Sequence, residues 1–261
     1  MSHTRIYAIL LQEFFFMRRS VEVLFDVLLF PLVNVVLFAF LSSYIGQSVD
    51  AFVVHQLLLG SLLWQFMYIV QYSVSVHTMW NLWARNLSNI FITPIHIAEY
   101  FTAAALSGAA KSTVVFVFSG TVLMLLFDFN VFEVGIGPLA LYMVSLWLFA
   151  VGVGIIILGL IFRFGTRISA FSWGFLPILQ PLMATLFPRT ILPAPFDSVA
   201  LLFPPTYVFE AARWQLQHGT IHWYYLLMSY IGNLLFVIMA SFAFRALFRK
   251  SQETGQFVRN E

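Results

Sequence analysis

The sequence is poor in charged residues and contains no cysteine. Only 9% of its 261 residues are Asp, Glu, Lys or Arg, whereas 61% are hydrophobic. A typical soluble domain has roughly 25% charged residues, so this composition excludes a soluble enzyme. The absence of cysteine excludes disulfides, thiol catalysis and cysteine-ligated metals. Aromatic residues make up 18% of the chain, which excludes disorder, and a net charge of +2 is too slight for a nucleic-acid-binding protein.

The common catalytic motifs are also missing. The chain has two lysines, Lys111 and Lys250, and neither follows a glycine, so the phosphate-binding pattern G-x-x-x-x-G-K-[ST] is absent. Neither H-E-x-x-H nor G-x-S-x-G occurs. His218 and His222 are four residues apart, but Gly219 lies between them and no acid lies close. We therefore expect no catalytic residues, no metal site and no ATPase site in this chain.

What the sequence does contain is long apolar stretches. About 20 residues are needed to cross a hydrocarbon core about 30 Å thick. Six candidate spans cover about residues 21–41, 55–76, 102–127, 138–162, 169–187 and 224–244. Pro177 and Pro181 interrupt the fifth, which is expected to be bent or short because proline kinks a helix. The sequence thus predicts an all-α polytopic membrane protein, with residues 1–261 forming one transmembrane domain.

The distribution of basic residues predicts the orientation. If six helices cross the bilayer, ten basic residues lie on one side: Arg5, Arg18, Arg19, Arg85, Arg163, Arg167, Arg245, Arg249, Lys250 and Arg259. Only Arg189 and Arg213 lie on the other side. Because cytoplasmic loops carry the excess of Lys and Arg, both termini are expected to be cytoplasmic.

Few ionisable residues fall within the spans. Lys111 lies inside the third span, where it is either a structural charge that snorkels toward water or part of a transport pathway. Glu22 and Asp26 lie near the cytoplasmic end of the first span. We expect them to form a solvated or salt-bridged helix start, neutralised by Arg18 or Arg19.

Residues 1–20 have a helical apolar pattern but not the order of a cleaved signal peptide. The pair Arg18–Arg19 follows the apolar stretch instead of preceding it. Ile6, Ile9, Leu10, Phe14 and Met17 recur at helical spacing, with Gln12 and Glu13 between them. The pattern favours an amphipathic helix in the cytoplasmic interface; the alternative is an extension of the first span.

The cytoplasmic stretch at residues 78–99 is too long and too patterned for a plain connector. Its apolar positions at helical spacing are Trp80, Trp83, Leu87 and Ile90 or Phe91, and its polar positions are Asn81, Arg85, Asn86, Ser88 and Asn89. Thr93-Pro94 is expected to end the helix. An amide-rich face under the bilayer fits contact with a cytoplasmic partner, whereas the Trp residues fit an interface anchor, and composition leaves both open.

The outer stretch at residues 188–223 holds five prolines and two apolar pieces, 199–203 and 207–214. These pieces are too short to span a bilayer and too apolar to lie in water, which predicts short re-entrant helices. Glu210 and Arg213 are three residues apart and are expected to pair. A local structural ion pair is favoured over a transport role.

Two stretches resemble a known family. Residues 89–100, which contain Thr93-Pro94 and Glu99-Tyr100, resemble a motif of the permease subunit of type-2 ABC exporters. Residues 202–213, with the pattern P-P-T-Y-V-x-E-x-x-R, resemble its second motif. Six spans, cytoplasmic termini and an interfacial N-terminal helix also match this family.

The resemblance implies an exporter subunit in the inner (cytoplasmic) membrane of a prokaryote. Two permease subunits, expected to be identical, would pair in membrane lipid, and two separate cytoplasmic ATPase subunits would bind ATP and Mg. The cargo would be lipid-linked, a glycan or a hydrophobic drug-like molecule. The alternative is a self-contained channel or secondary transporter, which would need mid-membrane acids or internal symmetry.

The resemblance also implies two functional regions. The ATPase-coupling residues would be Trp83, Arg85, Asn86, Asn89, Thr93, Pro94, His96 and Glu99. The outer gate would contain Pro204, Pro205, Tyr207, Glu210 and Arg213. The residues that bind the cargo are not identified by either motif.

Overall fold

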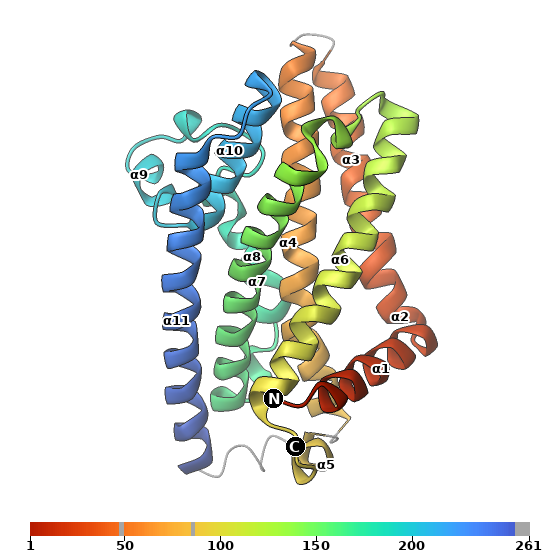
Figure 1. Ribbon diagram of the computed structural model, residues 1–261, viewed down its shortest axis with the longest axis vertical. Coiled ribbons are helices and arrows are strands. Elements are labelled where there is room, and N and C mark those ends of the chain that lie inside the picture. The colour runs from red at the N-terminus through yellow and green to blue at the C-terminus, as the bar shows by residue number, and fades with distance from the viewer. Residues whose placement is uncertain (47–49, 85–86, 254–261) are drawn as a thin grey trace.

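The computed structural model describes residues 1–46, 50–84 and 87–253, and its regular elements within these ranges are helices. Five helices are long and apolar enough to cross a membrane: Val21–Tyr44, α4 (Ala51–Trp83), α6 (Ile97–Phe127), α7 (Ile136–Phe164) and α11 (Trp223–Glu253). The first comprises α2 (Val21–Leu24), the π-helical turn η1 (Phe25–Leu29) and most of α3 (Phe30–Ile45). They run along the long axis of the molecule (Figure 1), as expected for a multi-pass membrane protein.

Four of the shorter helices lie at the two ends of this bundle. One end carries α1 (His3–Arg19) and α5 (Leu87–Ile92), and the other carries α9 (Phe196–Ala200) and α10 (Pro204–His218) (Figure 1). The remaining short elements are η2 (Val131–Val134), η3 (Thr166–Ile168), α8 (Phe171–Leu179), η4 (Gln180–Met183) and η5 (Arg189–Ile191).

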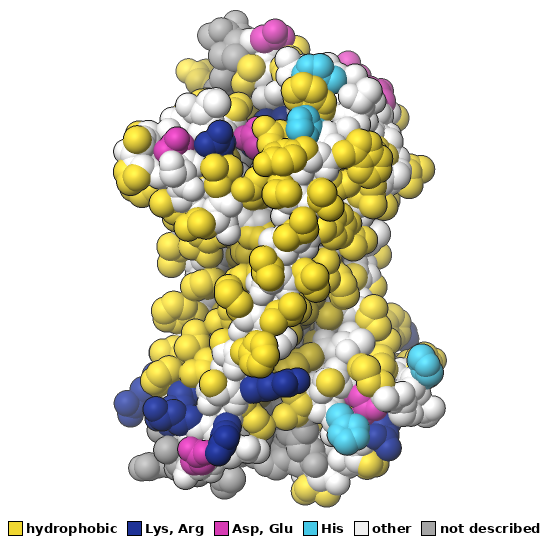
Figure 2. All heavy atoms as spheres, turned by 60° about the vertical axis from the view of Figure 1, so that its left-hand side comes forward, with side chains coloured by type: hydrophobic (Ala, Val, Ile, Leu, Met, Phe, Trp, Pro, Cys, Tyr) yellow, Lys and Arg dark blue, Asp and Glu magenta, His cyan; other side chains and the backbone are white. Residues whose placement is uncertain are grey.

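The surface divides into an apolar belt and two polar ends. Figure 2 shows hydrophobic side chains over the middle of the molecule and Lys and Arg gathered at the lower end. Exposed belt residues include Leu37, Phe40, Leu125, Leu234 and Phe242. In water such a belt would be strongly unfavourable, so lipid is its natural surrounding.

Two helices form the interior of the bundle. In the most apolar 18-residue stretch of α4, 67% of the residues are buried. The corresponding share is 61% in α7 and 22% in α11. Helix α4 contacts α3, α6, α7, α8 and α10. The core contains Leu62, Met67 and Val70 from α4 and Leu146 and Val153 from α7. The other long helices therefore surround α4 and α7 and present their outer faces to lipid.

Small residues allow close helix packing around α4. A Cβ at Gly154 of α7 would lie 2.7 Å from Val74 Cγ1, and one at Gly108 of α6 would lie 3.2 Å from the Val70 carbonyl oxygen. At both positions a larger side chain would collide with α4. The helix backbones approach closely because no side chain separates them.

The fifth predicted span, residues 169–187, is not one of the five long helices. It forms α8 and η4 and ends at Ala184, which has a left-handed backbone (φ 50°). Pro177 lies inside α8 and Pro181 inside η4, which explains why a continuous helix does not form. A sixth crossing therefore stays a prediction, and the segment that would provide it is broken.

The second predicted span, 55–76, lies within the longer helix α4. Helix α4 continues to Trp83, so the stretch 78–99 is not a single amphipathic helix. Asn81, expected on a polar outer face, is buried, and its Nδ2 donates a hydrogen bond to Tyr100 Oη at 3.1 Å. The helix continues because Asn81 finds this buried partner on α6, which a sequence pattern does not reveal. Thr93-Pro94 ends α5 as predicted.

Replacing Gly154 by Leu is expected to destabilise the fold. The new side chain would overlap Val74, and overpacking of this kind costs about 1–3 kcal/mol. The matched control is Gly137→Leu on the same helix, because a Cβ at Gly137 meets nothing within 4 Å. Thermal unfolding in detergent, followed by fluorescence-detected gel filtration, should show a lower Tm for G154L only. Equal Tm values would contradict the close packing of α7 on α4.

Candidate functional site

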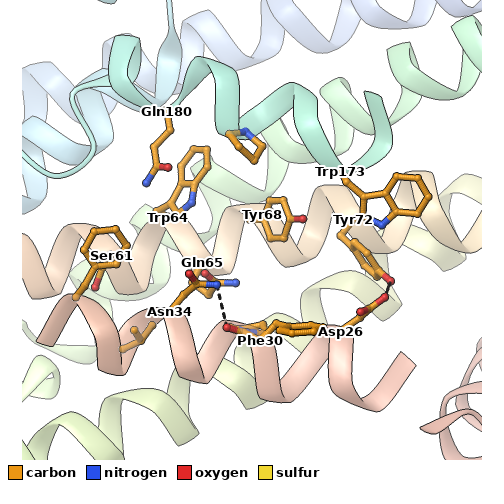
Figure 3. Close-up of a pocket in the computed structure, with 14 residues that line it drawn as sticks. Asp26, Phe30, Asn34, Ser61, Trp64, Gln65, Tyr68, Tyr72, Trp173 and Gln180 are labelled. Carbon is orange, nitrogen blue, oxygen red and sulfur yellow. Dashed lines mark hydrogen bonds between the residues drawn. The ribbon is translucent and has the colours of Figure 1, made fainter. Parts of the chain in front are cut away.

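A cleft of about 500 Å³ lies between the first long helix, α4 and the broken segment α8–η4 (Figure 3). Fourteen residues line it: Asp26, Phe30, Pro31, Asn34, Val35, Phe38, Ser61, Trp64, Gln65, Tyr68, Tyr72, Trp173, Pro177 and Gln180. From Asp26 to Phe38 the lining covers 12 helical steps, or about 18 Å at 1.5 Å per residue. The cleft thus extends over more than half of a hydrocarbon core about 30 Å thick.

The α4 wall of the cleft is a polar and aromatic stripe in an apolar helix. Ser61, Gln65, Tyr68 and Tyr72 lie three or four residues apart, so they share one face. Sequence reasoning missed this stripe, although polar residues at helical spacing inside an apolar span were a visible signal. A polar face inside a membrane helix is costly unless it serves packing or a pathway.

The facing wall comes from the first long helix. Asp26, Phe30, Asn34 and Phe38 recur every four residues and line the same cleft. Asn34 Nδ2 donates a hydrogen bond to the Phe30 carbonyl at 3.0 Å, which leaves the amide oxygen of Asn34 available to a ligand. The polar and aromatic stripe of α4 therefore faces a stripe of the first helix in which polar residues alternate with Phe.

Asp26 lies at one end of this cleft. The expectation of a solvated or salt-bridged helix start did not anticipate its contact in the structure, where Tyr72 Oη donates a hydrogen bond to Asp26 Oδ2. Asp26 belongs to η1, where the Phe30 N–H bonds to the Phe25 carbonyl five residues earlier. Pro31 follows and has no N–H to bond the Val27 carbonyl, which favours the wider π turn.

The third wall, α8–η4, is held against α4 at two levels. Gln71 Nε2 of α4 donates a hydrogen bond to the Ser172 carbonyl at 3.0 Å. Nearer the other end, a Cβ at Gly60 would lie 2.2 Å from the Thr185 carbonyl oxygen, so only glycine allows this contact. These contacts satisfy or shield backbone carbonyls of a segment that is not a continuous helix.

Arg213 supports the same segment from the end of the bundle that carries α9 and α10. Its Nη2 donates to the Ala184 carbonyl at 2.8 Å and pairs with Glu210 Oε1 at 3.0 Å, which confirms the predicted pairing. Glu210 Oε1 also accepts the Arg189 N–H at 2.8 Å. Burial lowers the pKa of Arg213, and the adjacent Glu210 carboxylate opposes this shift. The pair thus joins α10, η4 and η5, as a structural ion pair does.

The other predicted outer residues lie on the same helix. Pro204 and Pro205 are buried in the first turn of α10, where the missing N–H groups cost nothing. Tyr207 is partly buried, and its ring centroid lies 6.4 Å from that of Tyr225 on α11. All five predicted gate residues, including Glu210 and Arg213, therefore lie on α10, at the end of the bundle opposite α5.

At the opposite, basic end, Glu99 connects three segments. Its Oε1 accepts the Ser2 N–H at 2.7 Å, its Oε2 accepts the His96 N–H at 3.0 Å, and Arg5 Nη1 lies 3.5 Å from Oε2. Glu99 is fully buried and lies in the first turn of α6. A predicted coupling residue is therefore the point where α1, the turn after α5 and α6 meet.

The remaining predicted coupling residues lie around α5. Trp83, Asn89, Thr93, Pro94 and His96 are exposed at the basic end of the molecule, where α5 projects below α4 and α6 (Figure 1). Arg85 and Asn86 lie outside the described residues. The structure thus gathers the described members of this set on one accessible surface, which we call the α5 surface.

Lys111 has a structural partner. Its Nζ lies 2.8 Å from Glu13 Oε2 of α1, and the two side chains are 11% and 1% exposed. Of the two roles left open for Lys111, this contact favours the structural one. It also places Glu13 on the inner face of α1, against α6. Helix α1 is fixed at its start by Glu99 and near its end by Lys111, which sequence spacing did not indicate.

Replacing Arg213 by Gln is expected to cost about 1–3 kcal/mol of stability, because buried acceptors lose their donor. The control is Arg249→Gln, whose pairing with Glu253 at 3.0 Å is exposed. Exposed pairs contribute at most about 1 kcal/mol. Denaturation in detergent measures both variants, and an equal, small loss in R213Q would contradict the buried role.

The Lys111–Glu13 contact predicts a non-additive double variant. Lys111→Met and Glu13→Leu should each destabilise the protein by about 3–5 kcal/mol, because each removes one charge of a buried ion pair. The double variant should recover much of this loss, since no charge is left unpaired. Thermal unfolding of all four proteins measures the coupling, and additive losses would mean that the two charges do not interact.

Comparison with models of known protein families and with curated proteins gives no match to this sequence. The function is therefore inferred from three features of the chain itself. These are the apolar belt, the α5 surface and the polar cleft along α4.

Proposed function

We propose that this chain is the transmembrane subunit of an ATP-driven exporter of the type-2 ABC class. It would move a lipid-linked, glycan or hydrophobic drug-like cargo out of the cytoplasm or the inner leaflet. The energy would come from a separate ATPase subunit, because the sequence has no phosphate-binding loop of its own. The observation that carries the proposal is the α5 surface, which projects at the basic end and contains the motif that resembles a coupling helix.

The basic end is assigned to the cytoplasm. Arg18, Arg163, Arg167, Arg245 and Arg249 all lie on or beside segments that end there (Figures 1 and 2). Cytoplasmic segments of membrane proteins carry such an excess of basic residues. With this orientation α5 faces the compartment that contains ATP, and α9 and α10 face the outside.

Contacts at Glu99 give α5 a mechanical connection to the bundle. The turn after α5 leads into His96, whose N–H bonds to Glu99, and the same carboxylate holds Ser2 and Arg5 of the N-terminal segment. A displacement of α5 would therefore be passed to α6 and α1 together. An ATPase that binds α5 differently in its two nucleotide states would thereby shift the membrane helices, because a conformational change needs differential contacts.

The cleft along α4 is proposed as part of the cargo path. It lies on one side of α4, and its third wall is the broken segment α8–η4, which also forms the sixth crossing in this proposal. Two copies of the chain would pair in the membrane and enclose the path between them. Breaks in a helix at membrane depth are tolerated where they line a protein-enclosed cavity.

A self-contained secondary transporter is the second candidate. Asp26 favours it, because a carboxylate in an intramembrane cleft is the kind of group that couples transport to an ion gradient. Such a protein would move cargo uphill in sealed vesicles when only a proton or sodium gradient is supplied.

The ATPase partner can be tested at Asn89. This residue is exposed in α5, and Asn89→Arg would add a long charged side chain to the α5 surface without entering the core. The expected result is at least a tenfold loss of co-purification with the partner ATPase, or of cargo-stimulated ATP hydrolysis. The matched control is Gln217→Arg, exposed on α10 at the other end of the molecule.

Three results would contradict the proposal. The first is unchanged coupling in a folded N89R protein. The second is an equal loss of coupling in Q217R. The third is uphill transport by the purified chain with an ion gradient and no nucleotide, which would support the secondary transporter instead.

A further inference from the structure

The lining of the cleft along α4 carries charge of one sign only. Its 14 lining residues include one acid, Asp26, and no Lys, Arg or His. We propose that the cleft binds an amphipathic organic cation, with its positive group at Asp26 and its apolar rings along the aromatic wall. That such a cation is the transported cargo rests on the proposed function. That the cleft binds such a cation does not depend on transport.

The carboxylate of Asp26 has capacity for a ligand. Tyr72 Oη donates one hydrogen bond to Oδ2, whereas a carboxylate can accept about four. The side chain is half-buried and faces the cleft (Figure 3). A charge in such surroundings is costly without an opposite charge nearby, and the cleft lining supplies none. A bound cation would provide this charge.

Aromatic rings surround the same end of the cleft. Figure 3 shows Tyr72 beside Asp26, Trp173 of α8 beyond Tyr72 at the same end of the cleft, and Tyr68 farther along the α4 wall. Faces of Trp and Tyr attract cations within about 6 Å through their ring quadrupole. The same faces pack against flat apolar groups. A carboxylate flanked by aromatic rings therefore suits a delocalised or substituted organic cation better than a metal ion.

Farther along the cleft the lining is neutral and includes polar groups. Asn34, Gln65 and Gln180 supply amide groups there, and Asn34 lies about two helical turns after Asp26 (Figure 3). A volume of about 500 Å³ falls within the roughly 300–1,000 Å³ of sites that hold drug-sized ligands. The cleft is thus built for an elongated molecule with a cation at one end and neutral polar groups at the other.

This arrangement argues against the other cargo classes. A lipid-linked glycan carries phosphate, which Asp26 would repel and which no basic residue of the lining would bind. A neutral glycan could use the amides and aromatic rings but would leave Asp26 without a counter-charge. Among the cargo classes considered, the cationic amphiphile alone uses every chemical group of the cleft.

The proposal is tested by equilibrium binding to the purified chain in lipid nanodiscs, without nucleotide or ATPase. The probes are tetraphenylphosphonium and tetraphenylborate, which have nearly the same shape and opposite charge. Binding to empty nanodiscs is subtracted from each value. The variants are Asp26→Asn and Asp26→Glu, and the matched control is Glu22→Gln, one turn away and exposed.

We expect saturable binding of tetraphenylphosphonium at least tenfold tighter than any binding of tetraphenylborate. D26N should weaken the affinity for tetraphenylphosphonium about tenfold or more. The affinities of D26E and E22Q should stay within about threefold of the wild-type value. Equal affinity for the two probes overturns the proposal even if D26N fails to fold. Equal effects of D26N and E22Q overturn it as well. Because no ATPase is present, a failed coupling experiment at Asn89 leaves this result unaffected, and the two proposals fail separately.

Discussion

A broken helix at membrane depth needs hydrogen-bond partners that lipid cannot supply. The segment α8–η4 has this requirement because Pro177 and Pro181 remove two backbone donors. Helix α4 holds the segment through Gln71, which donates to the Ser172 carbonyl, and α10 holds its end through Arg213, which donates to the Ala184 carbonyl. The shape of the cleft follows from these contacts, since α8–η4 forms its third wall. Without them, the wall would have no fixed position beside α4.

Buried and half-buried carboxylates connect segments that are far apart in the sequence. Glu13 binds Lys111, Glu99 binds the N-terminal segment, and Glu210 binds Arg213 and the start of η5. In low-dielectric surroundings each unpaired charge would be strongly unfavourable. Each carboxylate therefore specifies which segments meet. Asp26 differs, because its contact is a neutral tyrosine and its surroundings are an open cleft, which is the basis for assigning it a ligand.

The two proposed sites lie at different depths of the same bundle. The α5 surface lies beyond the membrane helices at the basic end. The cleft starts at Asp26 and extends along α4 away from the basic end. Helix α4 belongs to both, since Trp83 ends it beside the α5 surface and Tyr72 lines the cleft. A partner that moves α5 would thus act on the helix that forms one wall of the cargo site.

The sequence alone determined the membrane class, five of the six predicted spans as long apolar helices, and the end that gathers basic residues, because hydrophobicity and charge act locally along the chain. It also predicted the Glu210–Arg213 pair, whose spacing lies within one helix. Only the tertiary structure decided that Asn81 is buried against Tyr100, that Lys111 pairs with Glu13, and that Asp26 shares a cleft with Tyr72. These contacts join residues 19 to 98 positions apart. Their formation depends on how the helices pack against one another, which no local pattern of residues encodes.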